Sequence, residues 1–197
     1  MPVKEINQLK KLDFQKQLVF SYLSCERFYP NYLFFSTNYN FGDPAILRSA
    51  IDFLHDSIFN KITNNQKMES LLQATNVNAP RPDDFATFYA SIAMYSAGIV
   101  YESISLLKLT DIPRILNDIS TMCTDAIDLF IQERDNMDYD EDDFEAKILN
   151  DSLMQTELSI QKGSIAYLQK IDQLNASDIN TLLQLQKNGT GTLIIAQ

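Results

Sequence analysis

Apolar residues recur at every third or fourth position through most of this sequence, the spacing that places them on one face of an α-helix. The clearest run is Ile112, Leu116, Ile119, Cys123, Ala126 and Phe130. With only five glycines and six prolines in 197 residues, the chain lacks the turn residues that closely spaced strands need. We therefore predict an all-α fold, a single-domain bundle of about seven helices over residues 1–197.

The first predicted helix begins after Asp13, whose carboxylate can accept a hydrogen bond from a free N–H group of the first turn. Pro30 predicts its end near Arg27, because proline disfavours helical geometry in the residue before it. Since proline also suits the first turn of a helix, a second, short helix is predicted over residues 31–39.

Asp43 followed by Pro44 is a second signal for the start of a helix. The Asp43 carboxylate can accept from free N–H groups of the first turn, and Pro44 suits the first helical position. This signal predicts a helix that runs to about Ile62. A short helix over residues 68–74 follows, and a loop over residues 76–84 divides the chain into two unequal halves.

Residues 85–107 contain one charged side chain, that of Glu102. A helix capped by Asp83 or Asp84 and running to about Lys108 would therefore be buried nearly all round. Its length approaches a bilayer span, but several tyrosines, serines and threonines make it too polar for that environment. We predict that this nearly uncharged helix lies at the centre of the bundle.

The remaining helices are predicted from capping residues and apolar spacing. Thr110 is the predicted cap of the next helix, and Gly163 could break or kink the helical pattern that follows the acidic segment. Ser177 is the predicted cap of a last helix ending at Asn188. The apolar tail, residues 192–197, is expected to dock on the body of the protein.

The charge balance restricts the partners that we expect. Sixteen basic and twenty-six acidic residues give a net charge of -10, which repels nucleic acids and anionic membrane surfaces. The chain has two cysteines and a charged N-terminal segment without the apolar run of a secretory signal, so we expect a cytoplasmic protein. No cofactor and no metal site are predicted.

The run from Leu18 to Phe35 contains the strongest candidate site, because Glu26 and Arg27 are its only charges. Buried charges must find partners, reach water or serve a ligand. A ligand or interface site would use the following side chains: Cys25, Glu26, Arg27, Tyr29, Asn31, Tyr32 and Asp43. The structural alternative, which we favour, is that Arg27 pairs with a carboxylate and the tyrosines fill the core.

Three weaker motifs have structural explanations that we prefer. Cys25 as a nucleophile would need His55, the one histidine, as its base, but a buried inert thiol is commoner. Asp52 and His55 have the spacing of half a di-iron site, which would need a second histidine. Within the acidic segment, residues 133–145, Asp138, Asp140 and Asp142 are spaced like the start of a calcium loop, yet the sixth position from Asp138 is not glycine.

The run from Cys25 to Tyr32 (CERFYPNY), followed by Phe41-Gly42-Asp43, resembles the signature of the bacterial YjaG-like family of uncharacterised helical proteins. The resemblance implies a cytoplasmic, all-helical homodimer and carries no activity. The positions that match the family pattern are Cys25, Glu26, Arg27, Tyr29, Pro30, Asn31, Tyr32, Gly42 and Asp43.

Two functions are consistent with these features. The first is a self-associating interaction or regulatory protein without catalysis, as the long uncharged helix indicates. The second is a small-molecule-binding protein or enzyme with a site around Glu26, Arg27, Tyr29 and Asp43.

Overall fold

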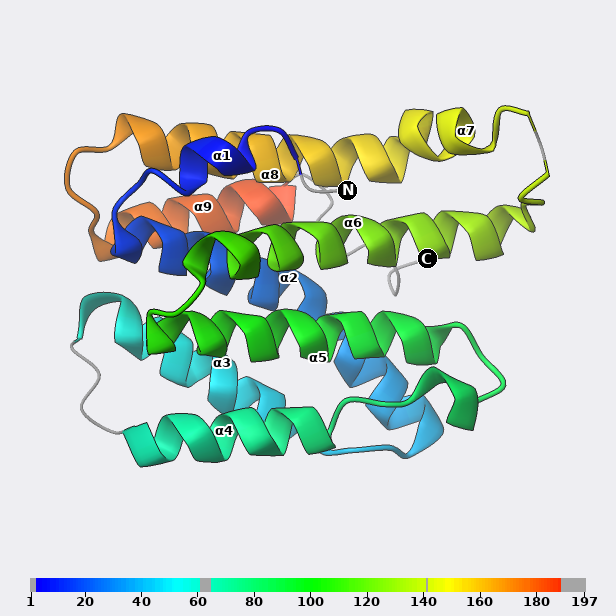
Figure 1. Cartoon of the computed structure of the whole chain (residues 1–197), viewed down its shortest axis with the longest axis horizontal. Coiled ribbons are helices and arrows are strands. Elements are labelled where there is room, and N and C mark those ends of the chain that lie inside the picture. The colour runs from blue at the N-terminus through cyan, green and yellow to red at the C-terminus, as the bar shows by residue number, and fades with distance from the viewer. Residues whose placement is uncertain (1–2, 61–64, 141, 189–197) are drawn as a thin grey trace.

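The chain folds into a bundle of helices, as a computed structural model describes for residues 3–60, 65–140 and 142–188 (Figure 1). These residues form nine α-helices and two 3-10 turns and contain no strand, which confirms the all-α prediction with two more helices than expected. The elements are α1 (Ile6–Leu9), α2 (Phe14–Tyr39), α3 (Pro44–Phe59), α4 (Asn65–Val77), η1 (Pro82–Asp84), α5 (Tyr89–Ser105), η2 (Leu106–Lys108), α6 (Ile112–Asp135), α7 (Phe144–Asn150), α8 (Ser152–Lys170) and α9 (Ala176–Asn188).

The nearly uncharged helix α5 is central, as predicted. It packs against α2, α3, α4 and α6, and small residues such as Ala90, Ala93 and Ala97 are buried at these contacts. Among the described residues, the stretch Tyr89–Lys108 is long and apolar enough to cross a bilayer by length and composition, and 61% of its most apolar window is buried inside the fold. The side chain of Glu102 is partly exposed and lies 3.6 Å from Arg114.

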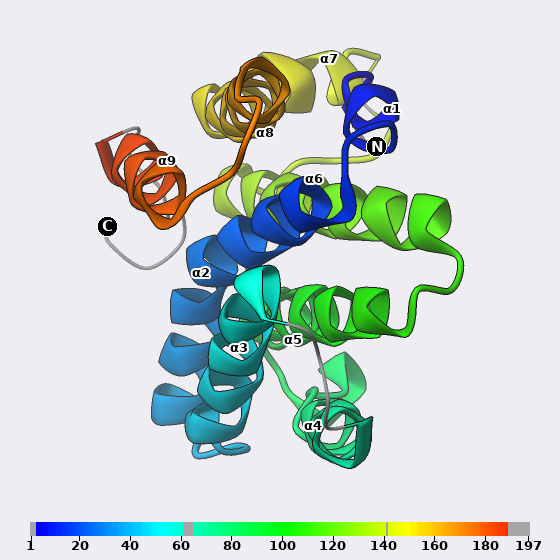
Figure 2. The same ribbon diagram turned by 90° about the vertical axis from the view of Figure 1, so that its left-hand side faces the viewer.

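A second group of helices covers α6 on the side away from α5 (Figure 2). Helix α8 packs on α6, and the short N-terminal helix α1 contacts both. Val3, Ile6 and Leu9 are buried there, so the N-terminal segment belongs to the core. Helix α4 packs against the opposite side of α5.

The predicted break at Pro30 is wrong, because α2 runs from Phe14 to Tyr39 with Pro30 inside it. The proline removes one helical hydrogen bond, the one to the carbonyl of Glu26, at a cost of about 3 kcal/mol. Phe28, Tyr32 and Phe35 on either side of it are fully buried, and each contributes roughly 1.5–3 kcal/mol. The packing of these rings therefore outweighs the local cost.

Two predicted helix starts in the second half differ from the structure. Asp83 and Asp84 lie in η1, and α5 begins at Tyr89, whose N–H group donates to Thr87 Oγ1 at 3.3 Å. Helix α6 begins one residue later than Thr110 predicts, after Asp111, which has a left-handed backbone with φ of 50°. These boundaries depend on how the connecting loops pack.

At the C-terminal end, Asn175 caps α9 in place of the predicted Ser177, because its Oδ1 accepts a hydrogen bond from Ser177 N at 2.9 Å. Gly163 lies inside α8 and does not break it. The predicted caps Asp13 and Asp43 are confirmed by bonds from Lys16 N and Ala45 N. The apolar tail, residues 192–197, and the expected end of the third helix at Ile62 lie outside the described residues.

Candidate functional site

The side chain of Arg27 extends from α2 across the interior to Glu157 on α8. Its Nε donates to Glu157 Oε2 at 3.0 Å and its Nη2 to Glu157 Oε1 at 2.8 Å. Both side chains are buried, with exposed fractions of 3% and 0%. Two parallel charge-assisted bonds of this kind fix the geometry of both side chains as well as their separation. The preferred prediction, that Arg27 pairs with a carboxylate, is confirmed.

This ion pair is the centre of a buried polar network that joins α2, α6 and α8. Gln161, one turn after Glu157, donates to Glu157 Oε1 at 2.8 Å. Ser120 of α6 donates to Gln161 Oε1 at 2.6 Å and accepts from the backbone N–H of Val3 at 3.3 Å. The network therefore also anchors the N-terminal segment on the layer that α8 and α6 form.

Electrostatics favour the charged form of Arg27 at this buried position. Burial alone lowers the pKa of Arg27, but the Glu157 carboxylate and the sulfur of Cys123 more than offset it, so the pKa lies above its ordinary value. Arg27 Nη2 approaches Cys123 Sγ at 3.7 Å. A buried pair with these partners strongly specifies how α8 sits on α2, because either charge left alone would be very costly.

Both cysteines lie in this interior and are free thiols with no exposed surface. Cys25 Sγ donates to Ser103 Oγ at 3.2 Å, and burial raises the pKa of Cys25 to about 12. Burial also raises the pKa of Cys123. His55 of α3 is partly exposed, and the centre of its ring lies 5.0 Å from the centre of the Tyr22 ring. The thiol of Cys25 therefore has a serine as its partner and is kept in the unreactive, protonated form.

Glu26 points away from its neighbour Arg27 and pairs with Arg48 of α3. Arg48 donates to the two Glu26 oxygens at 3.0 and 2.8 Å and to Asp52 at 2.8 Å. The Arg48 guanidinium also lies 5.4 Å from the centre of the Tyr29 ring. The pair is partly solvated, since a quarter to a third of each side chain remains exposed.

The tyrosines around this second pair are held in their neutral form. Burial, followed by the charge of Glu26 and a hydrogen bond with it, raises the pKa of Tyr22. Burial also raises the pKa of Tyr29, and the nearby charges of Arg48, Asp52, Glu26 and Asp43 act on it as well. The charges of Glu26 and Asp43 therefore both act on Tyr29 where α2 meets α3.

The corner between α2 and α3 accounts for Tyr32, Gly42 and Asp43. The Tyr32 hydroxyl donates to the backbone carbonyl of Asn78 at 2.7 Å, and Asn78 Oδ1 accepts from Asp43 N at 2.8 Å. Gly42 has φ of +67°, and a side chain there would collide with the Tyr32 hydroxyl. These contacts lock the end of α4 onto the turn that leads into α3.

The structure thus divides six of the seven predicted site residues among three places. Arg27 and Cys25 face the interior, Glu26 and Tyr29 face Arg48, and Tyr32 and Asp43 belong to the Asn78 corner. Asn31 is also buried, and its Oδ1 has no hydrogen-bond partner among the described residues. Nor do the described residues include any group of three or more His, Cys, Asp and Glu side chains able to hold a metal ion.

Sequence reasoning missed the partners Glu157, Gln161, Arg48 and Asn78. A signal existed for the first two, because Glu157 and Gln161 are in helical phase with the buried residues Met154 and Leu168 of α8. Polar side chains in phase with a core stripe indicate a buried network. Nothing in the local sequence distinguishes Arg48 or Asn78 from ordinary surface residues.

A groove of about 540 Å³ lies between α8 and α9, away from all seven residues. Ile160 and Tyr167 of α8 and Leu182 and Leu185 of α9 form its apolar part. Gly163 lies in its wall, and no atom lies within 4 Å of the position that a side chain would take there.

Comparison with known proteins gives a consistent result. The chain has the fold of a crystallised DUF416 family protein from Shewanella baltica, with a TM-score of 0.83 and 21% identity over 96% of this chain and 98% of that one. None of the curated proteins matches the chain. The sequence profile described as "Protein of unknown function (DUF416)" matches residues 4–192. The chain therefore belongs to the DUF416 family.

Proposed function

We propose that this protein is a cytoplasmic, self-associating interaction or regulatory protein without catalysis. The observation that carries the proposal is that the charged and thiol side chains of the predicted site are engaged within the chain. Arg27 binds Glu157, the Cys25 thiol donates to Ser103, and Glu26 binds Arg48. Each of these contacts joins two helices, which is a structural task.

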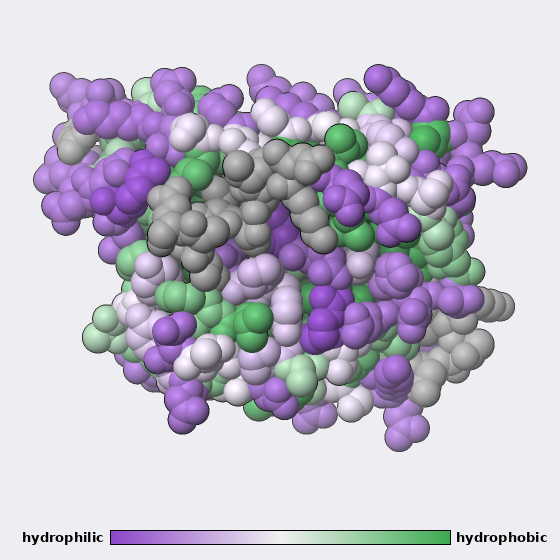
Figure 3. Space-filling view, turned by 180° about the vertical axis from the view of Figure 1, so that it is seen from behind, coloured by the Kyte–Doolittle hydropathy of each residue, from purple (hydrophilic) through white to green (hydrophobic). Residues whose placement is uncertain are grey.

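The charge and the cysteines support the same assignment. A net charge of -10 disfavours nucleic acids and anionic membranes as partners, and strongly hydrophilic residues line the upper edge of the face in Figure 3. Two unpaired, buried thiols suit a reducing compartment. The resemblance to the YjaG-like family is part of this proposal and favours a homodimer.

The mass of the full chain in solution, measured by light scattering across a dilution series, tests this function. We expect a dimer that dissociates on dilution. A chain that stays strictly monomeric at the highest concentration contradicts self-association.

The alternative is a small-molecule site where α2 meets α3. The charges of Arg48, Glu26 and Asp43 all act on Tyr29, and the Glu26–Arg48 pair is partly exposed. Asp52 also neighbours Arg48, so the cluster carries more negative than positive charge and favours a small cationic amine. This candidate excludes Arg27, whose donors are engaged by the buried Glu157 carboxylate of α8.

Thermal-shift measurements with spermidine test the alternative. If the cluster binds amines, spermidine raises the melting temperature of the wild type, and Glu26→Gln loses that shift. The matched control is Glu69→Gln, which neutralises a carboxylate of α4 that pairs with Lys108. This variant should keep the melting-temperature shift. Equal shifts in both variants would rule out the Glu26 cluster.

A further inference from the structure

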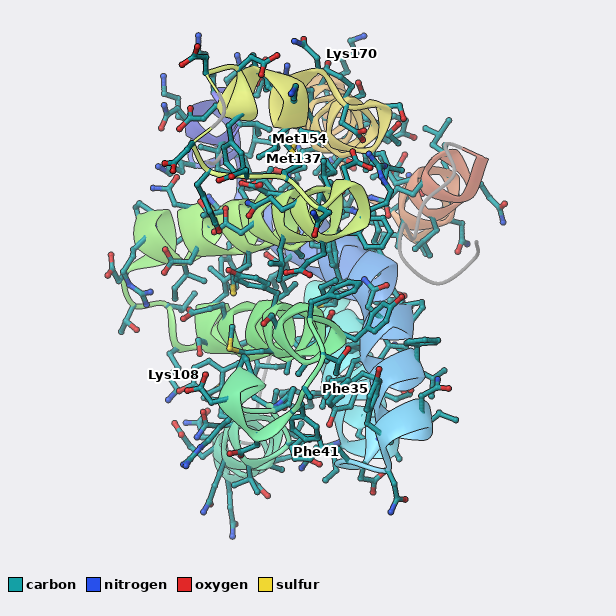
Figure 4. The ribbon with its side chains drawn as sticks, turned by 90° about the vertical axis from the view of Figure 1, so that its right-hand side faces the viewer. Phe35, Phe41, Lys108, Met137, Met154 and Lys170 are labelled. Carbon is teal, nitrogen blue, oxygen red and sulfur yellow. The ribbon has the colours of Figure 1, made fainter. Side chains whose placement is uncertain are left out.

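Two uncharged segments of this acidic chain meet at one end of the bundle. Neither residues 28–42 nor residues 85–101 contain an Asp, Glu, Lys or Arg. The ring centres of Phe34 and Tyr89 lie 5.1 Å apart, and the Tyr39 hydroxyl donates to Thr87 Oγ1 at 3.1 Å. Figure 4 looks onto this end, with Phe35 packed between α2 and the segment that leads into α5. In a chain of net charge -10, so large a region without charge is unusual.

One side of this region faces solvent. Pro30, Leu33, Phe34 and Thr37 follow one another at the spacing i, i+3, i+4 and i+7, which places them on one face of α2. Leu33 is 42% exposed and Thr37 is also exposed, while Pro30 and Phe34 are partly exposed. We call these four residues the α2 stripe. This spacing is the one with which helices commonly pack against a partner helix.

The other sides of α2 are already covered. Helices α3, α5, α6, α8 and α9 all contact it. Figure 3 shows the back of the molecule, the side on which α2 lies, and its lower left part carries pale and green residues. The α2 stripe is therefore the side of this helix that the rest of the described chain leaves partly exposed.

We propose that the α2 stripe is the surface through which two copies of this chain associate, which rests on the proposed self-association. A two-fold contact sets each residue of a patch against the same patch, so the patch must be self-complementary. An apolar, uncharged stripe meets that condition, and an acidic surface does not. A basic protein would be drawn to the acidic surface, whereas two acidic copies meet with least repulsion where carboxylates are absent.

The contact extends beyond the four stripe residues. A stable dimer buries about 800 Å² on each partner, which is more than a single helix stripe supplies. The partly exposed Tyr89, whose ring packs against that of Phe34, lies beside the stripe and enlarges it without adding charge. Tyrosine provides large contact area with little loss of side-chain freedom, so it suits this position.

Sedimentation equilibrium of the full chain, which measures the dimer dissociation constant, tests the proposal. Leu33→Glu and Thr37→Glu, made separately, each place a carboxylate on the stripe and, across the two-fold axis, against its own copy. We expect each to raise the dissociation constant about a hundredfold, since the dimer contains the substitution twice. Thr37→Glu leaves the packing of Leu33 intact, and circular dichroism verifies that both variants are folded.

Leu149→Glu is the matched control, because it adds the same charge at a 52% exposed leucine of α7. It should leave the dissociation constant unchanged. If both stripe variants dimerise as the wild type does, or if Leu149→Glu weakens the dimer equally, the stripe is not the interface although self-association stands. A wild-type chain that is monomeric at every concentration overturns self-association and the stripe together.

Discussion

Arg27 and Glu157 are 130 positions apart in the chain and form a two-bond ion pair in the interior. The pair connects α2 to α8, and Gln161 and Ser120 extend it to α6. Removing one partner would leave the other charge buried and unpaired, which destabilises a fold strongly.

Glu157→Gln tests how much the pair contributes. The variant keeps the size of the side chain but leaves the Arg27 charge buried without a counter-charge, so we expect the free energy of unfolding to fall by about 3–5 kcal/mol. Urea denaturation measures it. Glu69→Gln, which breaks the exposed pair with Lys108, should cost less than about 1 kcal/mol. Equal losses in the two variants would show that burial does not strengthen the first pair.

The double variant Arg27→Met/Glu157→Met separates the charge from the packing. Replacing both partners of a buried pair by apolar residues is often neutral or stabilising, so we expect a free energy of unfolding within about 2 kcal/mol of the wild type. Urea denaturation of the wild type, Glu157→Gln and the double variant gives the comparison. A double variant less stable than Glu157→Gln would contradict this account.

Gly42→Ala and Gly163→Ala should shift stability in opposite directions. Gly42 has φ of +67° and faces the Tyr32 hydroxyl, so alanine is strained and crowded there, and we expect a loss of about 2 kcal/mol or more. Gly163 lies inside α8 with open space around it, so alanine should add about 0.5–1 kcal/mol. Thermal unfolding of both variants measures the difference. A stable Gly42→Ala would show that the turn can rearrange.

The buried thiol of Cys25 makes stability depend on alkaline pH. Its pKa is about 12 in the folded chain against an ordinary value of 9.0. The contribution of the protonated thiol to the free energy of unfolding is therefore complete below about pH 9. It falls by about 1.4 kcal/mol per pH unit as the pH rises from there toward 12. Urea denaturation at about pH 8 and about pH 10.5 should show a smaller decrease in Cys25→Ala than in the wild type. Identical decreases would contradict the raised pKa.

Pro30→Ala tests the cost of the proline inside α2. Alanine restores an N–H group that can donate to the Glu26 carbonyl, so we expect the free energy of unfolding to rise by about 1–3 kcal/mol. Pro44→Ala is the control, because Pro44 occupies the first turn of α3, where no helical bond is missing. Urea denaturation at one protein concentration compares them. A loss of stability in Pro30→Ala would mean that its ring contributes more by contact than it costs.

Several features of the fold were predictable because they are local. The caps at Asp13 and Asp43 and the proline at the start of α3 act on the nearest backbone groups, and the structure has them as predicted. The central position of α5 followed from its lack of charge. The break at Pro30 was wrong because contacts of Phe28 and Tyr32 with other helices decide whether α2 continues.

The candidate site was predictable only in part. The residue types around Arg27 identified a buried charge that needed a partner. They could not identify that partner as Glu157, because Glu157 is 130 positions away and meets Arg27 only when α8 packs near α2. Neighbours in sequence can also have separate environments, since Glu26 pairs with Arg48 of α3 and Arg27 pairs with Glu157 of α8.

That this protein is helical, and which side of most helices is apolar, could be read from residue spacing, because both are properties of a few consecutive turns. Which charges pair, which thiols are inaccessible and that the α2 stripe is exposed became known from the folded chain. These depend on how helices distant in sequence pack, and packing is settled by the sum of many contacts across the whole core.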